Sequence, residues 1–159
     1  MTDFRALLRA LAETGVEFIV VGGAAATAHG SARLTLDLDV VYRRTPENIA
    51  RVVKSLDGHH PYLRGAPPGL PFQWDVETIR RGLNFTLVTD LGPIDFLGEI
   101  AGGGGYEALV PDTDALTLFG TECRCLALER LIQVKRAAGR VKDLEAIAEL
   151  EAIAEERRC

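Results

Sequence analysis

The stretch from Val20 to Val40 constrains the fold more than any other part of the chain. Glu17–Val21 is short, apolar and rich in β-branched residues, which is typical of a buried strand. The glycine pair Gly22-Gly23 follows, and then a run of small residues that suits a short helix ending at Gly30. Residues 34–42 are again strand-like. This order predicts a strand, a glycine turn, a short helix and a second strand in one unit.

The rest of the chain predicts further helices and two hairpins. Antiparallel hairpins are expected over 84–97 and 116–126, each around a turn that contains glycine. Residues 57–78 are expected to form a long loop, and Ala101–Gly105 a flexible break. Apolar residues at helical spacing predict four longer helices, over 2–14, 45–56, 127–138 and 142–157.

Strands interleaved with helices, together with an antiparallel hairpin, predict a mixed β-sheet in an α/β or α+β domain. The 159 residues, 47% of them hydrophobic, are enough for one compact unit with a sizeable core. We expect residues 1–126 to form a core sheet flanked by helices, and residues 127–159 to form a C-terminal helical segment packed on it. A tandem LEAIAE repeat over 144–155 favours such packing, and a partner-binding or dimer helix is the alternative.

Composition and charge exclude several classes of protein. No apolar run approaches the ~20 residues that span a bilayer, and the N-terminus lacks the apolar core of a signal peptide, so no membrane contact is expected. Three cysteines without a secretory signal favour reduced thiols and a cytoplasmic location. Cys123 and Cys125 are expected to be small apolar fillers on a strand. The net charge of -5 argues against a broad DNA-binding surface.

Three aspartates are the candidate catalytic and metal-binding residues. Asp37 and Asp39 alternate on the predicted strand and should face the same way, while Asp95 stands between apolar residues on another predicted strand. Three carboxylates without a matching histidine or cysteine set suit Mg²⁺ or Mn²⁺, provided that the two strands are neighbours. A solvent-facing edge of an amphipathic strand is the alternative. The intervening side chains are expected to point into the core: Leu36, Leu38 and Val40.

Two other features suit an anionic ligand. The pair Gly22-Gly23 lets a backbone approach phosphate oxygens closely, although neither a Walker A loop nor a GxGxxG fingerprint is present and a plain turn is the alternative. Residues 129–142 carry five basic side chains against one acid, which favours an anion or, alternatively, reflects solvated helix ends. Lys135 and Arg140 are five residues apart, and they can converge if Gly139 ends the helix between them.

Four further residues allow two interpretations each. His29 is either a group that faces a ligand or one that packs at a helix end. Arg33 either orients or pairs with the acids, or is a surface arginine. Phe72 and Trp74 either form a platform on which a base stacks or contribute to local packing, and we favour packing.

The string Gly22-Gly23, then Asp37-Leu38-Asp39, then Asp95 resembles the signature of the DNA polymerase beta-type nucleotidyltransferase superfamily. With His29-Gly30, Arg33 and Thr35 included, it resembles the small bacterial nucleotidyltransferases related to the AbiE-type toxins of toxin–antitoxin systems. The segment Lys135-x-x-Ala-x-Arg-x-Lys-Asp143 is similar to one in that group, and the resemblance covers about residues 15–150.

The resemblance implies a role for each matching residue. Asp37 and Asp39 would hold Mg²⁺, and Asp95 would complete the metal site and help to deprotonate an acceptor hydroxyl. ATP or another nucleoside triphosphate would be the substrate. The expected nucleotide-binding residues are Gly22, Gly23, Arg33, Lys135 and Arg140, of which the last two touch the triphosphate or the acceptor.

The leading hypothesis is therefore a Mg²⁺-dependent nucleotidyltransferase that moves a nucleoside monophosphate to a hydroxyl on an RNA end, a protein or a small molecule. The resemblance also implies that the chain is one component of a toxin–antitoxin pair, with an antitoxin protein as partner. A rival hypothesis is a catalytically weak or inactive binding module on the same fold, which acts through a protein partner. A metal-dependent hydrolase is the third.

Overall fold

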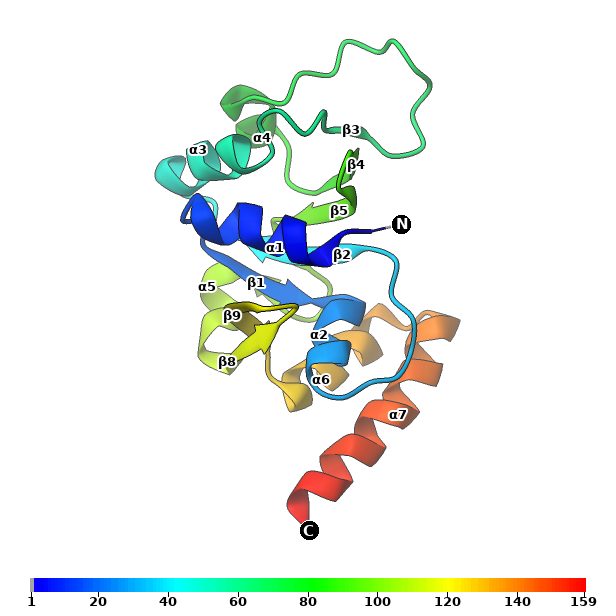
Figure 1. Ribbon diagram of the computed structural model, residues 1–159. Helices are drawn as coiled ribbons and strands as arrows, with labels where there is room; N and C mark the ends of the chain where they lie inside the picture. Colours follow the sequence, from blue (N-terminus) through cyan, green and yellow to red (C-terminus); the bar gives the residue numbers. More distant parts are fainter. Residues whose placement is uncertain (1) are drawn as a thin grey trace.

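The protein has an α+β fold, as predicted from the order of its strands and helices (Figure 1). The computed structural model describes residues 2–159. Seven strands form a mixed sheet in the order β3-β4-β5-β2-β1-β9-β8, and β6 and β7 form a separate two-stranded sheet. The strands are β1 (Phe18–Val21), β2 (Leu38–Tyr42), β3 (Tyr62–Leu63), β4 (Phe85–Thr89), β5 (Gly92–Leu97), β6 (Glu99–Ile100), β7 (Gly104–Gly105), β8 (Thr113–Leu118) and β9 (Thr121–Leu126).

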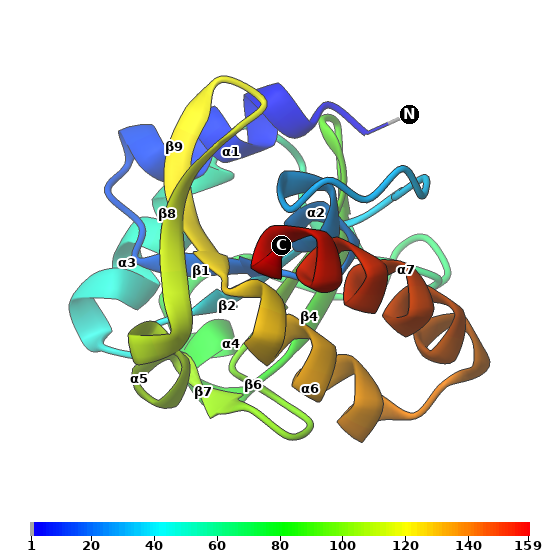
Figure 2. The same ribbon diagram turned by 90° about the horizontal axis from the view of Figure 1, so that it is seen from below.

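Helices cover both faces of the large sheet. In Figure 1, α3 and α4 lie toward the top and α1 crosses the middle of the molecule, whereas α2, α6 and α7 lie toward the bottom. Figure 2 looks from below and shows α6 and α7 as neighbouring helices that are joined by a short connection. The helices are α1 (Phe4–Glu13), α2 (Gly22–Ala28), α3 (Pro46–Ser55), α4 (Val76–Arg81), α5 (Tyr106–Leu109), α6 (Leu128–Ala138) and α7 (Val141–Arg158), with a 3₁₀ turn η1 (Val110–Asp112).

Local signals in the sequence explain where several elements begin and end. The Thr45 side chain accepts a hydrogen bond from the Asn48 N–H, and Pro46 occupies the first turn of α3, as the Thr-Pro pair predicts. Helix α6 ends at Gly139, which adopts a left-handed conformation with φ of 66°. The chain can then turn sharply into α7, which packs against α6.

Strand β2 is shorter than the predicted strand over 34–42. It begins at Leu38, and the Leu36 side chain, which we expected in the core, is 66% exposed. The neighbouring strand explains the difference, because β1 pairs with β2 only as far as Val21↔Asp39 before Gly22 opens α2. The residues before Leu38 therefore have no strand beside them on that side. The prediction for Leu36 was wrong, whereas Leu38 and Val40 are buried.

Two predicted irregular segments contain regular structure. The expected loop over 57–78 includes β3 and the start of α4, whose Asp75 cap accepts from the Thr78 N–H at 2.8 Å. A helix of six residues is too short for its apolar periodicity to be recognised. The expected flexible break at Ala101–Gly105 is instead the tight turn and second strand of a short hairpin, in which Ile100 of β6 pairs with Gly104 of β7.

The expected packing residues lie in or against the core. Cys123 and Cys125 are free, buried cysteines on β9. Trp74 packs against Phe85 and Phe96, and its indole N–H donates to the Val53 carbonyl at 3.0 Å. These contacts support the packing interpretation of Trp74. Within residues 2–159, no helix combines the length and the apolar character that crossing a membrane requires.

Candidate functional site

The three candidate aspartates converge on one face of the sheet. Strands β2 and β5 are parallel neighbours, and their register sets Asp39 directly opposite Asp95. Asp37 lies just before β2, and one oxygen of each of the three carboxylates lies within 4.8 Å of the other two. The predicted convergence is therefore confirmed, although Asp37 belongs to the segment that leads into the strand. We call these three residues the acidic triad.

The surroundings of Asp39 disfavour its negative charge. Burial, the largest cause, acts together with a hydrogen bond and the charge of Asp95 and with the charge of Asp37 to raise the pKa of Asp39 from 3.8 to about 7, whereas Lys142 acts in the opposite direction. The Oδ1 atom of Asp39 is buried and has no hydrogen-bond partner among the described residues. A divalent cation would supply the missing partner, and an all-oxygen ligand set is the one that Mg²⁺ and Mn²⁺ prefer.

The two glycines at the start of α2 leave room for the triad. Gly22 has φ of 64°, and a Cβ atom there would collide with the Asp39 carboxylate. A Cβ atom on Gly23 would lie 2.6 Å from the Thr35 hydroxyl oxygen. The glycine pair is thus required by the close approach of α2 to the segment that carries the acids. Its contact with phosphate stays a prediction.

A cavity of about 280 Å³ lies against Asp37 and Asp39 and is rich in basic side chains. Three of the five basic residues in 129–142 reach it, while Arg130 and Arg136 pair elsewhere, with Asp112 and Glu151. We call it the basic cavity. The four basic residues that line it are Arg33, Lys135, Arg140 and Lys142.

Asp143 joins two of these basic residues, and no role was predicted for it. Its carboxylate is buried, lies 2.6 Å from the Arg140 Nε atom and lies 4.0 Å from the Lys135 Nζ atom. Burial alone would raise the pKa of Asp143, but the hydrogen bonds and charge of Arg140 outweigh burial and lower it. Asp143 therefore holds Lys135 and Arg140 together across the turn at Gly139. Two signals were available in the sequence: Asp143 lies in the first turn of the last predicted helix, and it ends the segment 135–143 that carries part of the resemblance.

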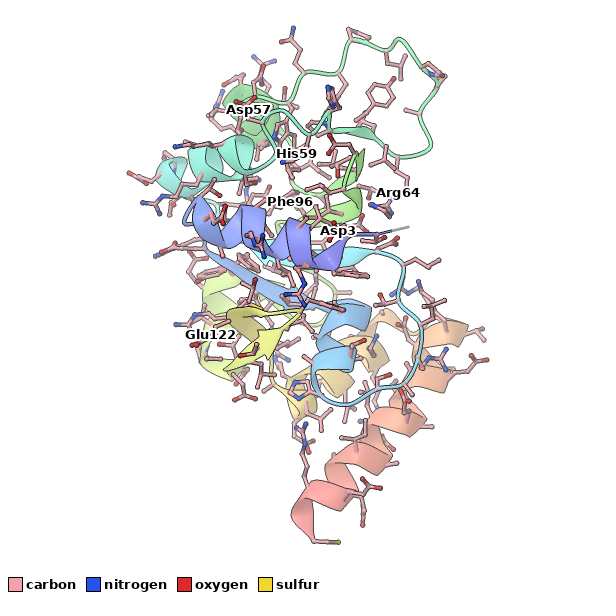
Figure 3. The ribbon with its side chains drawn as sticks, in the orientation of Figure 1. Asp3, Asp57, His59, Arg64, Phe96 and Glu122 are labelled. Atoms are coloured by element: carbon pink, nitrogen blue, oxygen red, sulfur yellow. The ribbon has the colours of Figure 1, made fainter. Side chains whose placement is uncertain are left out.

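Arg64 is the second residue that sequence reasoning missed. Its Nη2 atom donates to Asp95 Oδ1 and, at 3.0 Å, to the Leu87 carbonyl, and its Nη1 atom lies 3.5 Å from Asp37 Oδ2. Figure 3 shows Arg64 beside the end of the sheet that carries β3 and β4. No motif marks this arginine, because it lies in the predicted loop 57–78. Only the pairing of β3 with β4 brings it to the triad.

Two sequence candidates have other partners. Arg33 pairs with Glu145 of α7 at 3.4 Å and not with the acids, which supports the interpretation as a surface arginine, although it also lines the basic cavity. His29 is buried: its Nε2 atom bonds the Leu126 carbonyl at 2.8 Å, and its Nδ1 atom lies 3.1 Å from a guanidinium nitrogen of Arg157. His29 thus packs at the helix end and links α2 to α7.

A second, mostly apolar cavity of about 260 Å³ also reaches Asp39. Its apolar wall includes Leu97, Leu131 and Val134, from β5 and α6. The two cavities share five residues, which form their common boundary: Gly22, Asp39, Lys135, Arg140 and Asp143. The two cavities are therefore neighbours that meet at Asp39.

Comparison of the chain with known protein families and with curated protein sequences finds no match. The chemistry of the site therefore has to be inferred from its own residues: an acidic triad on two neighbouring strands, a glycine pair packed against it, and a basic cavity beside it.

Proposed function

We propose that this chain is a Mg²⁺-dependent nucleotidyltransferase, which moves a nucleoside monophosphate from a nucleoside triphosphate to a hydroxyl group. The observation that carries this proposal is the acidic triad of Asp37, Asp39 and Asp95 at the edge of a basic cavity. Carboxylates attract a cation, and the basic side chains attract an anion. A magnesium-bound triphosphate satisfies both at once.

The two cavities divide the substrate by its chemistry. The basic cavity suits the phosphates, because Lys135, Arg140 and Lys142 line it together with the backbone of the glycine pair. The apolar cavity suits the nucleoside. The phosphate that joins the two parts would then lie beside Asp39, where the cavities meet.

The residues of the site have complementary tasks in the transfer. The acceptor oxygen forms a bond to the α-phosphorus while the bond to the pyrophosphate oxygen breaks, and Asp95 takes the hydroxyl proton. Lys135 and Arg140 hold the negative charge of the departing pyrophosphate. When bound to the triad, Mg²⁺ supplies positive charge that stabilises the reacting phosphate.

A second candidate function is a binding module that acts through a protein partner, such as an antitoxin. It is favoured by large apolar side chains that are exposed and that either line the basic cavity or lie next in sequence to residues that line it. Leu34 and Leu36 are 88% and 66% exposed in the segment before β2, and Val141 is 75% exposed at the start of α7. A partner bound there would cover apolar surface and the cavity together.

The transfer proposal is tested with each of the four nucleoside triphosphates, labelled at the α-phosphate, in the presence of Mg²⁺. Total RNA, protein and small molecules from a cell extract serve as separate acceptor pools. We expect labelled product and released pyrophosphate with the wild type, and a loss of at least about a hundredfold with Asp95→Asn.

The matched control is Asp57→Asn, which changes an exposed aspartate outside the triad. This variant should transfer as the wild type does. No labelled product from any pool, with a folded wild type, would refute the transferase. Hydrolysis of phosphate esters without a nucleoside triphosphate would instead identify a hydrolase, and a co-purifying protein retained by Asp95→Asn would favour the binding module.

A further inference from the structure

Arg64 contacts the acidic triad but is not among the residues that line the basic cavity. Its guanidinium bonds Asp95 and the Leu87 carbonyl and lies 3.5 Å from an oxygen of Asp37. The Arg64 side chain is 27% exposed, and the side chains of Asp95 and Asp37 are 19% and 42% exposed. These ion pairs are therefore partly withdrawn from water. Charge interactions at such partly buried positions are stronger than on the open surface.

The backbone of Arg64 is fixed, whereas its guanidinium is held mainly by the acids. Its backbone N–H donates to the Thr86 carbonyl at 2.9 Å, which extends the pairing of β3 with β4 by one residue. The chain then leaves the sheet at Gly65, where φ is 80°. The Nε atom of Arg64 is buried without a hydrogen-bond partner among the described residues. Local packing therefore leaves the Nε–H donor of Arg64 without an acceptor. Among the described residues, the other guanidinium donors bond to the acids and to the Leu87 carbonyl.

The guanidinium divides the triad unequally. It contacts Asp37 and Asp95 and leaves the buried Oδ1 atom of Asp39 without a hydrogen-bond partner among the described residues. A single positive charge thus compensates two of the three carboxylates. A divalent cation ligated by all three would carry twice the charge and would lie close to the guanidinium, which it repels.

We propose that Arg64 is an internal counter-ion of the acidic triad, which competes with the divalent cation and moves aside when the cation binds. This inference rests on the proposed function, because that function requires a metal at the triad. In the absence of metal, Arg64 keeps the acids together and limits their mutual repulsion. When metal binds, the guanidinium leaves Asp37 and Asp95, while the backbone at residue 64 stays in the ladder with β4.

The surrounding segment allows this motion without unfolding. The Tyr62 hydroxyl donates to the Pro67 carbonyl and accepts from the Leu70 N–H at 3.1 Å. The rings of Tyr62 and Phe72 pack edge to face, with their centroids 6.1 Å apart. None of these contacts involves the guanidinium of Arg64. The side chain can therefore move while the segment from 62 to 72 keeps its own contacts.

The test measures Mn²⁺ binding by calorimetry at pH 8 without nucleotide. Arg64→Gln removes the positive charge and should bind Mn²⁺ about tenfold more tightly than the wild type, because two partly exposed ion pairs no longer oppose the metal. Arg64→Lys keeps a positive charge but lacks the planar guanidinium group, and its Mn²⁺ affinity should lie between those of the wild type and Arg64→Gln. Arg80→Gln is the matched control, because Arg80 is exposed and pairs with Glu77 of α4; its affinity should equal that of the wild type.

Thermal unfolding supplies a second readout. Metal-free Arg64→Gln should melt at a lower temperature than the wild type. Added Mn²⁺ should raise its melting temperature by more than it raises that of the wild type. Unchanged or weaker Mn²⁺ binding by folded Arg64→Gln would overturn the inference and leave the proposed function standing. If Arg64→Gln fails to fold, the same comparison is made with Arg64→Lys. Failure of the wild type and of every folded Arg64 variant to bind Mn²⁺ would overturn both the inference and the proposed function.

Discussion

At the scale of single residues, Asp39 combines three unfavourable features. It is largely buried, it faces Asp95 across the parallel strands, and its Oδ1 atom lacks a partner among the described residues. None of these favours the folded protein in the absence of a cation. Residues that oppose stability in this way are typical of functional sites, where binding of a ligand compensates for them.

The raised pKa of Asp39 predicts how the stability of the metal-free protein depends on pH. Its folded value of about 7 exceeds the ordinary value of 3.8, so the folded state binds the proton more tightly than the unfolded state does. The resulting stabilisation is complete below about pH 4 and is lost as the pH rises through 7. The Asp39→Asn variant has no carboxyl group at this position, so it does not lose this stabilisation as the pH rises. Relative to the wild type, this variant should therefore gain on the order of 2 kcal/mol of unfolding free energy between pH 5 and pH 8.

Urea unfolding at the two pH values, in the presence of a chelator, measures this difference. Asp57→Asn is the control and should change with pH as the wild type does. If the wild type and Asp39→Asn show the same dependence on pH, Asp39 does not hold its proton more tightly in the folded state, and this electrostatic account of the triad is wrong.

At the scale of elements, the junction between β1 and α2 determines how closely the helix approaches the acids. Gly22→Ala introduces a Cβ atom that meets the Asp39 carboxylate, and it also strains a backbone with φ of 64°. Gly58→Ala is a matched control, because Gly58 has φ of 83° and open space around it. Both variants should lose about 1 kcal/mol of stability from the backbone, and only Gly22→Ala should weaken Mn²⁺ binding as well.

Calorimetry with Mn²⁺ and urea unfolding of both alanine variants separate the two effects. Equal Mn²⁺ affinity in Gly22→Ala and Gly58→Ala would show that the space beside Asp39 is not needed for the metal. Weaker binding in Gly22→Ala alone would identify the glycine as a requirement of the site.

Much of this arrangement was predictable from local patterns in the sequence. The glycine pair after a buried strand, the Thr-Pro start of α3 and the stop at Gly139 each carry a conformational signal within a few residues. The convergence of Asp95 with Asp39 followed from the assumption that their strands are neighbours, and β2 and β5 are indeed paired.

The remainder depends on contacts between distant parts of the chain. Arg64 reaches the triad because β3 pairs with β4, and a two-residue strand leaves almost no pattern in the sequence. Asp143 becomes a site residue only when the turn at Gly139 brings Lys135 and Arg140 to it. Leu36 looked like a core residue because its alternation with Leu38 continues the strand pattern, but β1 ends before it could pair with that position.

At the scale of the whole molecule, an acidic protein presents one basic cavity. The net charge is -5, yet four basic side chains line the cavity beside the triad. Such a charge distribution disfavours extended polyanions and favours a compact anionic ligand that brings its own cation. The charge distribution therefore favours the proposed site for a magnesium-bound nucleotide over a general surface for nucleic acid.

The most direct test of the central claim is calorimetric titration of each nucleoside triphosphate into the wild type, Asp39→Asn and Asp57→Asn, with Mg²⁺ and with a chelator. We predict that the wild type and Asp57→Asn bind at least one nucleoside triphosphate only when Mg²⁺ is present, and that Asp39→Asn loses this binding while remaining folded. Binding that is unchanged by the chelator or by Asp39→Asn, or no binding by the folded wild type, would contradict a nucleotide site at the acidic triad.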